Sequence, residues 1–128
     1  MGSVIPLKKS ANSAYLDLKN LVDEKLTEVK KLIALKLDSK VGLIKKMSTY
    51  HLNSGGKRLR ALLTLGSAKL AGYDSLGKRD VSLSACVELI HSATLLHDDV
   101  IDESDLRRGI KTTNALWGNQ SSILVGDY

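Results

Sequence analysis

Residues 81–102 read VSLSACVELIHSATLLHDDVID, and this stretch decides the fold. Its centre is apolar nearly all round, so we expect a buried helix that runs from Val81 to about Leu106. Cys86 lies within this helix and is the sole cysteine of the chain, so it has no partner for an internal disulfide and should be buried. The stretch ends in three carboxylates, those of Asp98, Asp99 and Asp102.

The sequence before this stretch also shows helical periodicity. We expect helices at 14–37, 40–51 and 57–70, with a break at Asn53-Ser54-Gly55-Gly56 and a loop at about 72–79. The first helix carries an apolar stripe that should lie in the core or at a subunit interface: Tyr15, Leu18, Val22, Leu26, Val29 and Ile33. There is no strand-like alternation, so the predicted fold class is all-α.

The two ends of the chain lead to separate expectations about its domain organisation. Residues 1–11 are predicted to be a flexible leader, with Ser10 or Asn12 as the helix cap, and residues 12–128 to form one domain. The final residues, SSILVGDY, begin another apolar segment that reaches Tyr128 without a cap or a polar end. This pattern indicates a domain that is truncated at its C-terminus.

The composition favours a phosphorylated small molecule as the ligand. The 128 residues are 43% hydrophobic and carry a net charge of +5. Five of the fourteen acids lie within residues 98–105, and Arg107, Arg108 and Lys111 follow directly. A nucleic-acid groove should instead be basic and rich in aromatic side chains, whereas Phe is absent and aromatics make up 4% of the chain, so we expect no nucleic-acid partner. No apolar run reaches eighteen residues and residues 1–20 lack the apolar stretch of a secretory signal, so we expect a cytoplasmic or organelle-matrix protein.

The three aspartates are candidate ligands of magnesium. Asp98 and Asp102 are four residues apart and Asp99 and Asp102 three apart, so each pair can converge on one helix face. Mg²⁺ prefers hard oxygen ligands and bridges to substrate phosphates. The alternative is a solvated acidic helix end, but the apolar residues before Asp98 argue against it.

The segment Gly55-Gly56-Lys57-Arg58-Leu59-Arg60 is a candidate site for a diphosphate. Glycines let the backbone approach an anion closely, and a helix N-terminus offers N–H groups. Lys57 and Arg60 would then lie on one helix face as two cations. The alternative is a basic surface loop, which is the more common role of such a turn.

Two further elements complete the candidate site. Arg107 and Arg108 are adjacent, and in a helix they would point about 100° apart, so they could serve two different anions rather than one. His91 lies about two turns before Asp98 and could donate a hydrogen bond to a phosphate. A solvated basic turn and a histidine satisfied within the core are the respective alternatives.

Together GGKRLR, ELIHSATLLHDDVID and ESDLRRG, in this order, closely resemble the first half of the trans-polyprenyl diphosphate synthases. The resemblance implies the N-terminal part of the isoprenoid synthase helical bundle. It implies that isopentenyl diphosphate is bound by Lys57, Arg60, His91 and Arg108. It also implies that Arg107 holds the allylic diphosphate and that the Mg²⁺ ions bridging to it are bound by Asp98, Asp99 and Asp102. One departure is Ala61, where members usually have proline, and this change is expected to loosen the turn.

The implied reaction is a condensation of isopentenyl diphosphate with an allylic prenyl diphosphate. Ala93 and Thr94 stand where aromatic residues give short products in this family, so a long product of the quinone side-chain class is expected. The resemblance also implies a homodimer in the complete enzyme and a peripheral membrane contact for product release. Members carry a second aspartate-rich motif in a C-terminal half that is not in this sequence, so the chain alone is expected to be inactive.

Two other functions remain open from the sequence. One is a non-catalytic interaction module that binds a partner subunit through the stripe at 14–37. The other is a terpene cyclase, although those enzymes lack the GGKRxR turn and the arginine pair.

Overall fold

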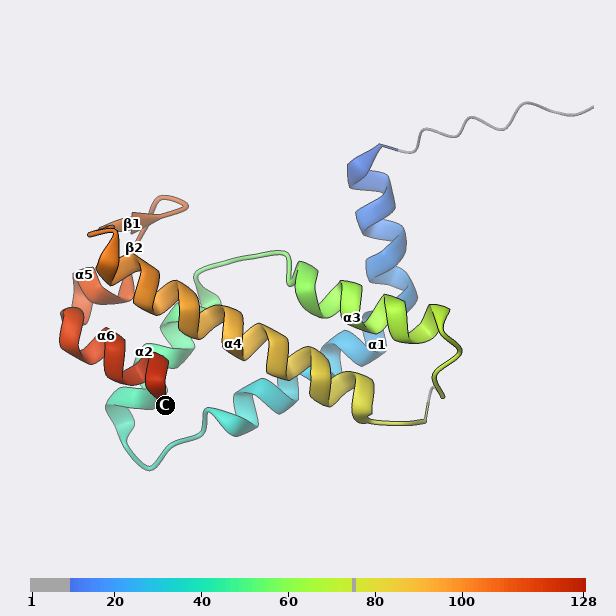
Figure 1. Cartoon of the computed structure of the whole chain (residues 1–128), viewed down its shortest axis with the longest axis horizontal. Helices are drawn as coiled ribbons and strands as arrows, with labels where there is room; N and C mark the ends of the chain where they lie inside the picture. The colour runs from blue at the N-terminus through green and yellow to red at the C-terminus, as the bar shows by residue number, and fades with distance from the viewer. Residues whose placement is uncertain (1–9, 75) are drawn as a thin grey trace, which may run out of the picture.

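The computed structural model describes residues 10–74 and 76–128, and over these residues the chain is helical apart from one small hairpin (Figure 1). Most of the expected leader, residues 1–9, lies outside the described residues. The elements in chain order are α1 (Ala11–Lys36), α2 (Gly42–Asn53), α3 (Leu59–Leu70), α4 (Arg79–Ile101), β1 (Leu106–Arg107), β2 (Ile110–Lys111), α5 (Thr113–Trp117) and α6 (Asn119–Asp127). The all-α prediction is confirmed.

Helix α4 runs through the middle of the molecule, and the other helices pack along it (Figure 1). Helices α1 and α3 contact α4 and each other, and α5 and α6 contact α4 farther along the chain. Helix α2 packs against α5 and α6. Within the part of the chain that the structure describes, no helix combines the length and apolar character needed to cross a bilayer.

The larger core lies between α1, α3 and α4. Helix α1 begins where the hydroxyl of Ser10 accepts a hydrogen bond from the Ser13 N–H, as expected for a cap. Four residues of the predicted stripe are buried against α3 and α4, namely Val22, Leu26, Val29 and Ile33. Tyr15 and Leu18 are partly buried beside them. The stripe is therefore core, and the interaction module that would use it to bind a partner is disfavoured.

A smaller core joins α2, α4 and α6 through Met47, Leu96 and Val125. Ile44 and Trp117 pack against it. The Trp117 ring meets the ring of Tyr50 edge-on, with 5.1 Å between the centroids and an interplanar angle of 72°. Such contacts add specificity to apolar burial. They fix the C-terminal helices against the end of α4 that carries the aspartates.

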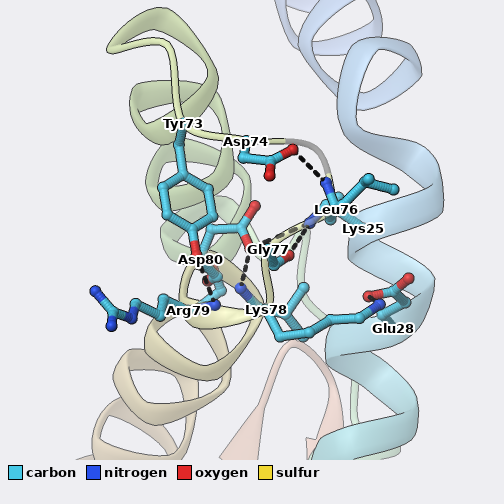
Figure 2. A network of polar contacts seen from close by, with 11 residues as sticks. Lys25, Glu28, Tyr73, Asp74, Leu76, Gly77, Lys78, Arg79 and Asp80 are labelled. Carbon is cyan, nitrogen blue, oxygen red and sulfur yellow. Dashed lines mark hydrogen bonds and ion pairs between the residues drawn. The ribbon is translucent and has the colours of Figure 1, made fainter.

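The loop between α3 and α4 is tied to α1 by polar contacts (Figure 2). The Lys25 ammonium donates to the Gly77 carbonyl and lies 3.3 Å from Asp80 Oδ1. Lys78 and Glu28 form a second ion pair at 2.8 Å. Together these contacts set the direction in which α4 leaves the loop.

Two expectations about α4 are wrong. It is not buried on every side, because Leu83 and Ile90 are 55% and 59% exposed and Cys86 is also exposed. It ends at Ile101 rather than near Leu106, since Glu103 takes a left-handed backbone with φ 52° that a helix cannot continue.

Candidate functional site

The aspartates lie at the C-terminal end of α4, where the apolar helix meets the hairpin. Asp98 and Asp102 are exposed, whereas Asp99 is buried. The Asp102 N–H donates to the Asp98 carbonyl at 2.8 Å and closes the last turn. The sequence therefore placed the carboxylates correctly at a helix end, but the structure makes them unequal in exposure.

Asp99 is paired with Arg107. Arg107 Nε donates to Asp99 Oδ2 at 3.3 Å, and Nη2 donates to Oδ1, so the contact is bidentate. This hydrogen bond is the main reason that the pKa of Arg107 is raised, and the charges of Asp98 and Asp102 contribute. Across residues 10–74 and 76–128, no three His, Cys, Asp or Glu side chains form a group that could hold a metal ion. Of the three aspartates, Asp99 is thus engaged by Arg107, and the three do not form a three-ligand group in the described ranges.

Arg107 and Arg108 lie in a hairpin and not in a helix, which corrects the expected geometry. Arg107 in β1 pairs with Ile110 in β2, and Arg108 and Gly109 form the turn with φ of 51° and 77°. Two positive φ values are typical of a type I′ turn. The two arginines still point to different partners, as expected, because Arg107 faces Asp99 and Arg108 faces the glycine turn.

The glycine turn and the arginine pair meet, although they are far apart in sequence. Gly55 and Gly56 have φ of 108° and 127°, and a Cβ at Gly56 would lie 3.1 Å from Arg108 Nη1. Only glycine combines this backbone with such a close approach. Lys57 is exposed, with its ammonium 5.1 Å from the centroid of the Tyr15 ring.

The start of α3 differs from the expectation in two respects. The helix begins at Leu59, so Lys57 lies before it and does not share a helix face with Arg60. The Ala61 N–H is also not open to an anion, since it donates to Glu88 Oε1 at 3.0 Å. A proline at this position could not make that bond. Ala61 therefore adds a contact where a looser turn was expected.

His91 lies within reach of three cations. Burial is the first cause that lowers its pKa, and the charges of Arg60, Arg107 and Arg108 lower the pKa further, while Glu88 opposes them. The neutral imidazole is thus favoured at pH 7 and keeps one N–H donor. The charges of Arg60, Arg107 and Arg108 therefore all act on His91.

Ala93 and Thr94 lie on different sides of α4. Ala93 lines a cavity of about 870 Å³, together with Leu89, Leu96 and Val125. Thr94 is exposed, and its hydroxyl donates to the His91 carbonyl at 2.7 Å. Of the two, Ala93 is the residue whose size can affect this cavity.

The sequence reasoning missed two residues that shape the site. Glu88 of α4 is buried where it accepts the Ala61 N–H from the first turn of α3, and its signal was a single acid inside an apolar run. Asn114 Nδ2 donates to the Ser104 carbonyl at 3.0 Å and holds the turn after the aspartates, and no motif marked it.

Known proteins provide an independent comparison. Octaprenyl diphosphate synthase from Escherichia coli is 43% identical over 111 residues, which are 87% of this chain and 34% of that protein. The chain spans about a third of the length of the curated relatives it matches. The solved structure of a decaprenyl diphosphate synthase from Rhodobacter capsulatus is 47% identical with a TM-score of 0.84, covering 89% of this chain and 35% of that one.

A second solved structure, a polyprenyl synthase from Caulobacter crescentus complexed with calcium and isoprenyl diphosphate, is 41% identical with a TM-score of 0.86. It covers 95% of this chain and 36% of that one. These likenesses confirm the expected isoprenoid synthase helical fold. A family model described as polyprenyl synthetase matches residues 41–128. Since that match covers more than half of the sequence, the chain belongs to the polyprenyl synthetase family.

Proposed function

We propose that the protein containing this chain condenses isopentenyl diphosphate with an allylic diphosphate to form a long-chain trans-polyprenyl diphosphate. The observation that carries the proposal is the meeting of the glycine turn with Arg108, whose charge acts on His91 together with those of Arg60 and Arg107. Several cations facing a close backbone turn suit a diphosphate. The octaprenyl and decaprenyl synthases among the relatives support a long product.

The carboxylates at the end of α4 are of the ligand type that suits magnesium, although among the described residues they do not form a three-ligand group. Asp98 and Asp102 offer exposed carboxylate oxygens four residues apart, which is the ligand type that Mg²⁺ prefers. Asp98, Asp99 and Asp102 are the residues that would hold the metal. When bound, Mg²⁺ supplies positive charge that stabilises a leaving diphosphate.

The remaining roles belong to side chains of the chain itself. Lys57, Arg60, His91 and Arg108 bind and orient isopentenyl diphosphate, while Arg107 neutralises charge on the allylic diphosphate. The apolar cavity beside Ala93 receives the growing chain, and in the complete protein further packing over it would exclude water from the reacting carbons. Arg107 is hydrogen-bonded to Asp99 in this structure. Its guanidinium must therefore contact Asp99 and the allylic diphosphate at the same time.

The proposal is tested by giving the complete gene product labelled isopentenyl diphosphate and an allylic primer, with and without a chelator. A prenyltransferase yields elongated diphosphates only when magnesium is free. Cyclic hydrocarbons would instead identify a terpene cyclase, and the absence of any product would favour a non-catalytic module.

A further inference from the structure

Glu88 is a buried acid whose position the proposed reaction does not explain. It lies on α4 with 4% of its surface exposed, next to the core that includes Ala61 and Ala85. A carboxylate in such surroundings is costly unless it is paired and hydrogen-bonded. Its partners therefore indicate why an acid occupies this place.

Its two oxygens contact two different parts of the segment after the glycine turn. Oε1 accepts the Ala61 N–H, in the first turn of α3. Such N–H groups have no partner within the helix, and a negative charge there is favoured by the helix dipole. Oε2 lies 3.8 Å from Arg58 Nη1, which makes an ion pair.

Arg58 extends the network to a third element. Its Nη2 donates to the carbonyl of Leu52, in the last turn of α2, at 2.9 Å. Arg58 itself has a left-handed backbone with φ 52°, a conformation that persists only where surrounding contacts require it. One carboxylate of α4 thus joins the end of α2, the turn and the start of α3.

Along the sequence, the residues that contact Glu88 lie beside the residues that are proposed to bind diphosphate. Lys57 precedes Arg58, and Arg60 lies between Arg58 and Ala61. His91 is three residues after Glu88 on α4, about one helical turn away. Because Arg58 and Ala61 are fixed to Glu88, the backbone that carries Lys57 and Arg60 is fixed relative to His91.

We infer that Glu88 is a positioning residue, which holds the Lys57–Arg60 segment against α4 so that its cations and His91 act on one diphosphate. The inference rests on the proposed function for the identity of that diphosphate. Glu88 does not touch the substrate. It acts through Arg58 and through the Ala61 N–H.

The test measures KM for both substrates in the complete gene product carrying Glu88→Ala or Glu88→Gln. Glu88→Ala should raise KM for isopentenyl diphosphate on the order of tenfold, because displaced binding groups lose much of their effect, and should change KM for the allylic substrate less than about twofold. Glu88→Gln keeps an acceptor for the Ala61 N–H but loses the charge opposite Arg58, so it should fall between wild type and Glu88→Ala.

Two control variants bracket this result. Arg60→Ala should shift the same KM, since Arg60 is proposed to contact that diphosphate directly. Glu28→Ala removes an acid whose ion-pair partner is Lys78 of the α3–α4 loop, outside the contacts of Glu88, and should leave both KM values unchanged. If Glu88→Ala does not fold, the KM of Glu88→Gln for isopentenyl diphosphate tests the inference instead. Equal shifts of both KM values, or a lower melting temperature with neither KM changed, would overturn the inference.

A separate measurement distinguishes this inference from the proposed function. If wild type elongates no allylic diphosphate, the proposed function fails, and calorimetric titration with inorganic diphosphate then judges Glu88. An affinity about tenfold weaker in both Glu88→Ala and Arg60→Ala would support the positioning role. Unchanged affinity in Glu88→Ala, or no binding by wild type, would contradict it.

Discussion

Asp99 differs from Asp98 and Asp102 because its carboxylate has a structural partner. Asp99 is 3% exposed and is bonded to Arg107 from the hairpin, while the other two carboxylates face solvent. Arg107 is therefore linked to the backbone of α4 through the same carboxylate that the resemblance assigns to magnesium. Substitutions at the three aspartates should consequently separate effects on catalysis from effects on stability.

The first prediction uses this difference. Asp98→Ala or Asp102→Ala in the complete gene product should lower magnesium-dependent turnover on the order of a thousandfold, because a ligand that stabilises the leaving group is lost. Their melting temperatures should stay near that of wild type. Asp99→Asn should lower both turnover and melting temperature, since it weakens the bond to Arg107. Turnover within threefold of wild type in Asp98→Ala or Asp102→Ala would refute the metal assignment.

The second prediction concerns two histidines. The pKa of His51 and that of His91 are both below the ordinary value, in each case first because burial disfavours the charged form. Below about pH 6.5 the unfolded chain therefore binds more protons than the folded chain. The free energy of unfolding should decrease as the pH falls from 7 to 5.5, measured by urea unfolding of the 128-residue chain. His51→Asn should reduce the slope, and a pH-independent midpoint would contradict the prediction.

At the scale of the element, the α3–α4 loop depends on Lys25 (Figure 2). The Lys25 and Asp80 side chains are 18% and 8% exposed, so Lys25→Met removes the charge partner of a nearly buried carboxylate, which still accepts the Val81 N–H, and the donor to the Gly77 carbonyl. We expect a loss of about 1–3 kcal/mol in the free energy of unfolding. Lys45→Met is the matched control, because it breaks a pair with Asp38 that is 60% and 59% exposed and should cost less than about 1 kcal/mol. Equal losses would argue against the tie to α1.

The helices were predictable because each follows an apolar stripe with a period near that of the helix. The expected range 14–37 differs from α1 by only a few residues. The hairpin was not predictable, since strands of two residues show no alternation, and Gly109 after Arg108 was its only signal. The end of α4 was predicted near Leu106 rather than at Ile101, because the hairpin that follows the helix was not recognised. Residues near Asp105 have helical propensity but are held in a turn by Thr112 and Asn114.

The candidate site was only partly predictable. The pattern of the motifs identified Arg60, His91 and Arg108 as candidates, and the charges of both arginines act on His91. The pairing of Asp99 with Arg107 could not be predicted, because this bond depends on how the hairpin folds back onto α4. Such contacts depend on tertiary structure, which local patterns do not encode.

At the scale of the whole molecule, the cavity beside α4 leads to a prediction about product length. Ala93 lines this cavity of about 870 Å³ with Ile90 and Leu96. Ala93→Phe should fill part of it and shorten the polyprenyl product of the complete gene product, as seen by chromatography of the hydrolysed alcohols. Ala93→Ser keeps the size of the side chain and should leave the distribution unchanged. An unchanged distribution in Ala93→Phe would show that another residue limits the chain.

The last prediction is that the 128-residue chain alone does not catalyse condensation, even with magnesium and both substrates. Ile90, which lines the cavity beside Ala93, is 59% exposed, so the apolar wall of the proposed reaction chamber is open to water. Water would quench a carbocation there. The aspartates at the end of α4 also form no group of three metal ligands in the described ranges 10–74 and 76–128, and Asp99 is paired with Arg107. The leaving diphosphate would therefore be incompletely neutralised.

The assay follows transfer of radiolabel from isopentenyl diphosphate into butanol-extractable product. Near-UV circular dichroism of Trp117 should be recorded in parallel, because its edge-on contact with Tyr50 reports whether the smaller core is packed. A packed chain without turnover is the expected result, with self-association through the exposed apolar side chains visible by light scattering. Sustained turnover by this chain would contradict the prediction. It would mean that the water-exposed cavity beside Ala93 and an Arg107 paired with Asp99 are sufficient for the reaction.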